Sequence, residues 1–187
     1  MKANHGSIIQ YAGISNPSGA VALNDRLFIV GDDEDNQLRI YDCNRFDKPI
    51  QTLSLSNLFK GVIKDGEDLE VDIESMATIN HVLFIIGSHS TSRTGEYRPA
   101  RHRLIALQFK LDANKKLTVN PIGEIYTQLI DSLKQDSRFN NYQFDKAEKL
   151  PPKAIGGLSI EGLASTPDNG LLIGFRNPLS GGKIDKD

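Results

Sequence analysis

The stretch Glu74–Ser90, "ESMATINHVLFIIGSHS", decides the fold because two further segments of the chain repeat its pattern. They read "SGAVALNDRLFIVGDDE" from Ser18 and "EGLASTPDNGLLIGFRN" from Glu161. Each has apolar residues, a turn, a second apolar run, a glycine and a polar tip, which predicts a β-hairpin. The glycines that align without a gap are Gly31, Gly87 and Gly174. A hairpin repeated in this way indicates a repeat architecture.

The hairpins extend into larger antiparallel units. The runs "LFIV", "LFII" and "GLLI" are short and continuous, as is typical of strands buried on both faces. Residues 37–43, "QLRIYDC", and 102–111, "HRLIALQFKL", alternate apolar and polar residues and predict third strands, while "PIQTLSL" and "KLTVNPIGEI" predict fourth strands. A repeated unit of about four strands is a blade of a β-propeller. We therefore predict an all-β fold of about three blades, with a β-sandwich as the alternative.

The spacing of the repeats indicates one insertion and an open architecture. Residues 124–152 lengthen the third repeat, and "IYTQLIDSLKQ" has helical spacing, which predicts one amphipathic helix followed by a polar loop. Residues 1–187 form a single domain on this interpretation. Because propellers close with about four to eight blades, we expect part of a longer propeller. Its remaining blades would come from a longer chain or an oligomer.

The composition excludes some classes of function. The chain has 187 residues, a net charge of −2 and 25% charged residues, which gives no case for nucleic acid or an anionic membrane as partner. No apolar run approaches the ~18 residues of a membrane span. One cysteine allows no internal disulfide. With no signal peptide visible, we expect a cytoplasmic protein.

The motifs also resemble a known family. The segments "GISNPSGAVALNDRLFIVGDDEDNQLRIY", "DIESMATINHVLFIIGSHSTSRTGEYRPARHRLIAL" and "LSIEGLASTPDNGLLIGFRNPLSGGK" together resemble the DUF3616 family of uncharacterised bacterial proteins. The order of "GSHS", "RPARHRL", "IEGL" and "GFRNPL" carries this resemblance, which implies a β-propeller longer than this chain. "IEGL" is also similar to an element of the phytase-like esterase propellers, an association without chemical content.

Acidic residues gather where the propeller fold predicts a common site. Equivalent loops of all blades lie on one face near the axis, and converging carboxylates repel unless a cation or arginines neutralise them. Their oxygens suit Ca²⁺ or Mg²⁺ as cofactor. The predicted metal ligands are Asp32, Asp72, Glu74 and Glu161. For the tip "DDED" the alternative is a solvated hairpin end whose charge discourages edge pairing.

Two of these carboxylates also suit catalysis. Asp72 and Glu74 flank Ile73 and therefore point to the same side of an extended segment, and Glu161 occupies the place that matches Glu74. His89, in "GSHS", adds a nitrogen that shifts the choice of metal towards a transition metal. The predicted catalytic residues are Glu74, Glu161 and His89. The alternatives are capping of backbone N–H groups by the two glutamates and a structural role for the histidine.

Arginines supply a counterpart for an anionic ligand. "RTGEYRPARHR" includes Arg98, and "GFRN" places Arg176 and Asn177 at a tip. Guanidinium groups hold phosphate or carboxylate in bidentate fashion, so these three residues are the predicted ligand-binding set. Pairing with acidic residues of the same protein is the alternative for the arginines.

Together these patterns predict a propeller with an acidic divalent-cation site that binds or hydrolyses a small phosphorylated or carboxylated ligand. As an enzyme it would resemble a metal-dependent phosphoesterase, in which a cation lowers the pKa of bound water. The alternative is a non-catalytic protein-interaction scaffold whose acidic residues serve structure.

Overall fold

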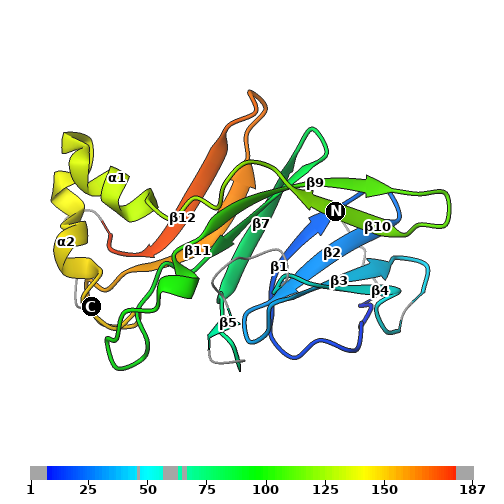
Figure 1. Ribbon diagram of the computed structural model, residues 1–187, viewed down its shortest axis with the longest axis horizontal. Coiled ribbons are helices and arrows are strands. Elements are labelled where there is room, and N and C mark those ends of the chain that lie inside the picture. Colours follow the sequence, from blue (N-terminus) through cyan, green and yellow to red (C-terminus); the bar gives the residue numbers. More distant parts are fainter. Residues whose placement is uncertain (1–7, 46, 57–62, 65–66, 180–187) are drawn as a thin grey trace, which may run out of the picture.

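The computed structural model describes residues 8–45, 47–56, 63–64 and 67–179 of the chain. The fold is mostly β, with three antiparallel sheets of four, four and two strands and a short helical segment (Figure 1). The strands of the first sheet, in spatial order, are β1 (Pro17–Ala22), β2 (Leu27–Asp32), β3 (Gln37–Asp42) and β4 (Gln51–Ser54).

The second sheet repeats the arrangement of the first, and the third sheet repeats its first two strands. The second sheet consists of β7 (Ile73–Ile79), β8 (Val82–Gly87), β9 (Leu104–Leu111) and β10 (Leu117–Pro121). The third consists of β11 (Ser159–Ser165) and β12 (Leu171–Asn177). A separate two-stranded ribbon joins β5 (Ile63–Lys64) to β6 (Glu67–Asp68). The three predicted hairpins and the predicted third and fourth strands are confirmed.

The first strands of the three sheets lie side by side, with β7 between β1 and β11 (Figure 1). Small residues allow this close approach. A Cβ added to Gly19 would lie 3.0 Å from Cα of Ser75, and the Ser75 hydroxyl donates to the carbonyl of Leu163 at 3.4 Å. These three residues therefore join β1, β7 and β11 at one level.

The second sheet is buried on both faces because a core lies on each side of it. Met76 and Ile85 pack in the core shared with the first sheet, whereas Ala77 and Ile86 pack in the core shared with the third sheet. This explains the continuous run "LFII". For the third sheet the prediction of two buried faces is wrong, since burial alternates along β12 and Leu172 is 62% exposed.

The insertion holds more helix than the sequence predicted. Helix α1 (Leu129–Gln135) begins later than the helical spacing suggested. Tyr126, within the predicted helix, forms a β-bridge with Leu104 and so extends the second sheet. The predicted polar loop instead contains η2 (Ser137–Tyr142) and α2 (Phe144–Ala147). Apolar side chains of α1 and α2 pack in the core shared with β11, so the insertion covers the third sheet.

One further helical turn lies outside the sheets and the insertion. A 3-10 turn, η1 (Pro99–Arg101), lies in the connection from β8 to β9. Among the described residues, no helix is long and apolar enough to cross a membrane.

The contact between β1 and β7 generates a stability prediction. Gly19→Val should destabilise the protein by about 1–3 kcal/mol, because the new side chain meets the Ser75 backbone, which has little room to move. Ala22→Val, at an exposed position of the same strand, is the matched control and should have little effect. Urea unfolding of both variants measures the difference, and equal stabilities would contradict the proposed close contact.

Candidate functional site

The first strands of the three sheets each carry a β-bulge at the same point. The register shifts around Ser18 in β1, around Glu74 in β7 and around Glu161 in β11. These are the residues that the sequence repeat aligned. A bulge leaves one residue unpaired and re-aims its side chain, which is why bulges are common beside active sites.

We call Asp33, Asp72, Glu74 and Glu161 the acidic cluster, because the charges of the other three all act on Glu74. Asp33 directly follows β2, and Asp72 directly precedes β7. The cluster therefore draws on all three sheets at one end of their strands. The sequence predicted three of its members as metal ligands but placed Asp32 where Asp33 lies.

Two arginines partly neutralise the acidic cluster. Nη1 of Arg101 lies 3.0 Å from Oδ2 of Asp72, and Nη1 of Arg176 lies 2.8 Å from Oε1 of Glu161. Arg101 also contacts Oε1 of Glu70 at 3.0 Å. Arg176 therefore lies beside the acidic cluster, and so does Arg101, which no sequence pattern distinguishes from its neighbouring arginines.

Glu74, like Asp33, has no arginine partner among the described residues. It is half-buried, and no hydrogen bond or ion pair to its side chain occurs in the described residues. Burial, followed by the negative charges of Asp72, Glu161 and Asp33, raises its pKa to about 8, although Arg176 acts in the opposite direction. The Glu74 carboxyl therefore carries a proton around neutral pH unless another positive charge joins the site.

Asp32 stabilises the local backbone through hydrogen bonds of its carboxylate. It is fully buried, and its carboxylate accepts hydrogen bonds from the backbone amides of Ser15, Asn16 and Glu34 at 3.0–3.3 Å. Burial acts to raise its pKa, but these hydrogen bonds outweigh burial and lower it. The first acid of "DDED" thus holds the segment before β1 against the end of β2.

His89 belongs to a different cluster. The His89 side chain is fully buried, and its Nδ1 lies 2.9 Å from the carbonyl oxygen of Gly87. The backbone of His89 is in the left-handed region, with a φ of 52°. Its neighbour is His102, at a ring-centroid distance of 5.4 Å. Burial lowers the pKa of both imidazoles to about 4. The sequence analysis did not select His102, because no repeating pattern predicts that the connection from β8 to β9 brings it next to His89, 13 residues earlier.

The other two predicted ligand-binding residues, Arg98 and Asn177, contact residues outside the acidic cluster. Arg98 is 51% exposed and pairs with Glu96 at 2.8 Å, which is an ordinary surface ion pair. Asn177 donates to the carbonyl of Pro152 at 3.3 Å and so anchors the end of the insertion. Only Arg176 of these three contacts a member of the acidic cluster.

The donor set determines which cation the site suits. Within the described ranges, no group of three or more His, Cys, Asp or Glu side chains is arranged to hold a metal ion. A Ca²⁺ site made by protein alone needs about 6–8 oxygen ligands. Mg²⁺ commonly uses one or two carboxylates and completes its shell with water and ligand phosphate. Of these two coordination patterns, the acidic cluster is compatible with the one that needs fewer carboxylates.

The fold and site define a mostly β protein built from repeated antiparallel hairpins, with an acidic cluster at their shared end. The chain belongs to the DUF3616 family, described as "Protein of unknown function (DUF3616)", which matches residues 16–120. The match contains Asp33, Asp72 and Glu74, whereas Glu161 and Arg176 lie beyond it. No curated protein matches the sequence.

The Glu74 carboxyl should make stability fall as pH rises. Its folded pKa of about 8 lies above the usual carboxyl value, so the folded state holds a proton that the unfolded state releases. Stability should therefore decrease from about pH 4.5 to pH 8 in chelator, and Glu74→Gln should remove about 1–2 kcal/mol of that decrease after allowance for partial exposure. Glu124→Gln, at an exposed position, is the control, and melting temperatures across pH test the difference.

The buried histidines should act in the opposite direction. Their folded pKa of about 4 lies below the usual value of 6.5, so stability is present above pH 6.5 and is lost as pH falls towards 4. His89→Gln should reduce this acid-induced loss by about 1–3 kcal/mol. His81→Asn, in the exposed β7–β8 turn, should leave it unchanged. An unaltered acid transition in His89→Gln would show that His89 titrates normally.

Proposed function

We propose that the three sheets are blades of a β-propeller and that the acidic cluster lies at its axial site. Adjacent inner strands, meandering strand order and equivalent bulges in β1, β7 and β11 support this proposal. The exposed outer side of β12 would then face strands of the same blade supplied by a longer chain or an oligomer.

We further propose that the acidic cluster binds a divalent cation and, through it, a small phosphorylated or carboxylated ligand. The observation that carries this is the charge imbalance around Glu74. The four carboxyl groups of the cluster outnumber the guanidinium groups of Arg101 and Arg176, and Arg101 is shared with Glu70, so at least two negative charges are uncompensated when all groups are ionised. A divalent cation would offset two of these charges and would let Glu74 ionise.

The ligand would bridge the cation and the arginine side of the cluster. Glu74 with Asp72 or Asp33 supplies the one or two carboxylates that Mg²⁺ commonly takes. Arg176 is exposed and presents its guanidinium beside these groups, where it would hold an anionic oxygen of the ligand. For hydrolysis, Glu161 is the exposed carboxylate placed to accept a proton from water, and a bound cation makes that water acidic.

An interaction role has its own support. β12 pairs only with β11 among the described strands, and Leu172 within β12 and Leu179 just after it are exposed, at 62% and 58%. Open edges and apolar side chains favour pairing with another strand. We propose a scaffold role as the second candidate, in which this edge binds protein.

Cation binding gives the direct test of the primary proposal. Adding Mg²⁺ at about pH 8 should raise the melting temperature, because the cation replaces the proton that Glu74 otherwise keeps. Glu74→Gln and Glu161→Gln should each lose most of this rise. Glu124→Gln, which removes the same charge from an exposed site, should retain it.

One outcome would contradict the proposed cation site. A rise in melting temperature of the same size in Glu74→Gln and in the unaltered protein would rule out the acidic cluster as that site.

A separate assay distinguishes an enzyme from a binding protein. Hydrolysis of a phosphate monoester that requires both Mg²⁺ and Glu161 would identify an enzyme.

A further inference from the structure

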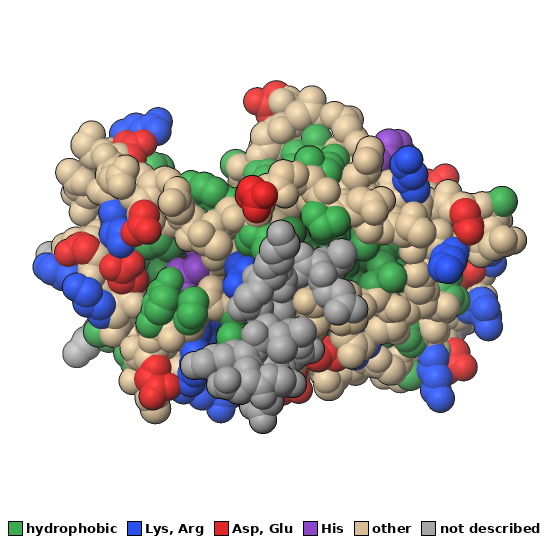
Figure 2. Space-filling model, in the orientation of Figure 1, with side chains coloured by type: hydrophobic (Ala, Val, Ile, Leu, Met, Phe, Trp, Pro, Cys, Tyr) green, Lys and Arg blue, Asp and Glu red, His purple; other side chains and the backbone are tan. Residues whose placement is uncertain are grey.

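A groove of about 810 Å³ lies between the first and second sheets, away from the acidic cluster. We call it the basic groove, because its charged lining residues are Arg26, Arg45, Lys115, Lys116 and a single acid, Asp42. Lys and Arg side chains also appear in Figure 2 at the end of the molecule where Figure 1 draws the β9–β10 turn. The volume is in the range of small-molecule sites.

Asp42 organises two of the cations. It is 2% exposed and accepts two hydrogen bonds from Nε of Arg26, at 2.8 and 2.9 Å, while Nζ of Lys115 lies 3.4 Å away. The hydrogen bonds from Arg26 outweigh burial and hold the pKa of Asp42 well below its usual range. Asp42 therefore stays ionised and fixes both cations, while the terminal guanidinium nitrogens of Arg26 make no hydrogen bond in the described residues.

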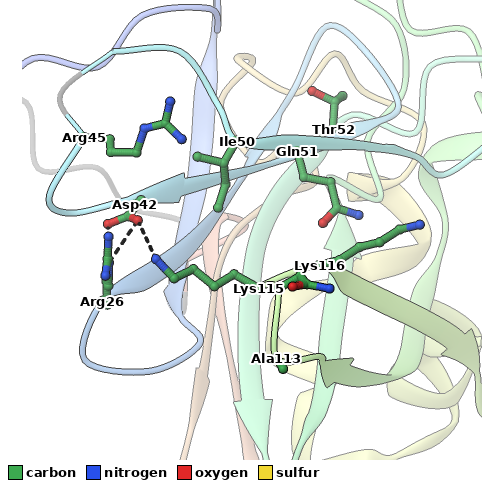
Figure 3. Close-up of a pocket in the computed structure, with 10 residues that line it drawn as sticks. Arg26, Asp42, Arg45, Ile50, Gln51, Thr52, Ala113, Lys115 and Lys116 are labelled. Carbon is green, nitrogen blue, oxygen red and sulfur yellow. Dashed lines mark hydrogen bonds and ion pairs between the residues drawn. The ribbon is translucent and has the colours of Figure 1, made fainter.

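The groove is held together across the two sheets. The Gln51 side chain donates to the carbonyl of Leu117 at 2.8 Å and accepts from its backbone amide at 2.8 Å. This pair of bonds fixes β4 of the first sheet against β10 of the second. Figure 3 shows Arg26 and Lys115 directed at Asp42, with Arg45 on the other side of the same end and Lys116 directed away. The cations at that end are thus preorganised.

From this arrangement we propose that the basic groove binds a small dianion, a phosphate monoester, between Arg26, Arg45 and Lys115. These three cations and Asp42 sum to two positive charges at this end of the groove, since Lys116 is directed away, and two charges match a dianion, whereas the whole chain has a net charge of −2. Arg45 has no ion-pair partner in the described residues, so it is available to the ligand. Guanidinium groups bind phosphate oxygens in bidentate fashion, which favours phosphate over a single carboxylate.

The basic groove is independent of the proposed cation site. Arg26 precedes β2 and Asp33 follows it, so the six residues of the strand separate the two by about 20 Å. A small ligand in one site does not reach the other, so each site can be tested separately.

Titration calorimetry with phenyl phosphate at low salt tests the groove. Arg45→Gln and Lys115→Gln should each weaken binding by about tenfold, since each removes one of the cations that face the dianion. Arg93→Gln, which removes an exposed arginine elsewhere, should leave the affinity unchanged. Glu74→Gln should also bind normally, which separates this site from the acidic cluster.

Two results would overturn the proposal. One is equal affinity of Arg45→Gln and Arg93→Gln, including the case in which neither they nor the unaltered protein binds phenyl phosphate. The other is equal binding of phenyl sulfate, a monoanion of similar shape, because the groove is matched to two charges. Circular dichroism of Arg45→Gln checks its fold, and its exposed position makes disruption unexpected.

Discussion

The close approach of β1, β7 and β11 sets the arrangement of the three sheets and of the acidic cluster. Strands from different sheets cannot come this near unless the facing residues are small, and here a glycine meets the backbone at Ser75. Because the strands are held at one level, their bulges lie at one level too. The acidic cluster is therefore a consequence of backbone packing, and its side chains converge without needing to be near in sequence.

The acidic cluster shows how charge is managed where strands converge. Asp72 and Glu161 each face a guanidinium group at 3.0 Å or less, so their charges are balanced within the protein. Glu74 has no such partner and meets the field of its neighbours in a half-buried place. Its position resembles that of groups whose ionisation depends on a ligand, so the absence of an arginine partner, and not the number of acids, points to function.

Much of the fold could be predicted because the repeat aligned residues that occupy equivalent places. Ser18, Glu74 and Glu161 were matched by counting from glycines, and each is at a bulge. The prediction for Asp32 lacked one fact, namely that residues before the repeat fold back to bind its carboxylate. Contacts of that kind, like the pairing of His89 with His102, depend on connections whose paths no periodic pattern encodes.

The strand order has a consequence for how the protein folds. In every sheet, each strand pairs with the strand next to it in the chain, so sheet formation closes mostly short loops. Contacts between sheets join residues much farther apart in sequence, as Ser75 and Leu163 do. Since the entropy of loop closure is lost before distant contacts form, the sheets should assemble early and their docking should limit the folding rate.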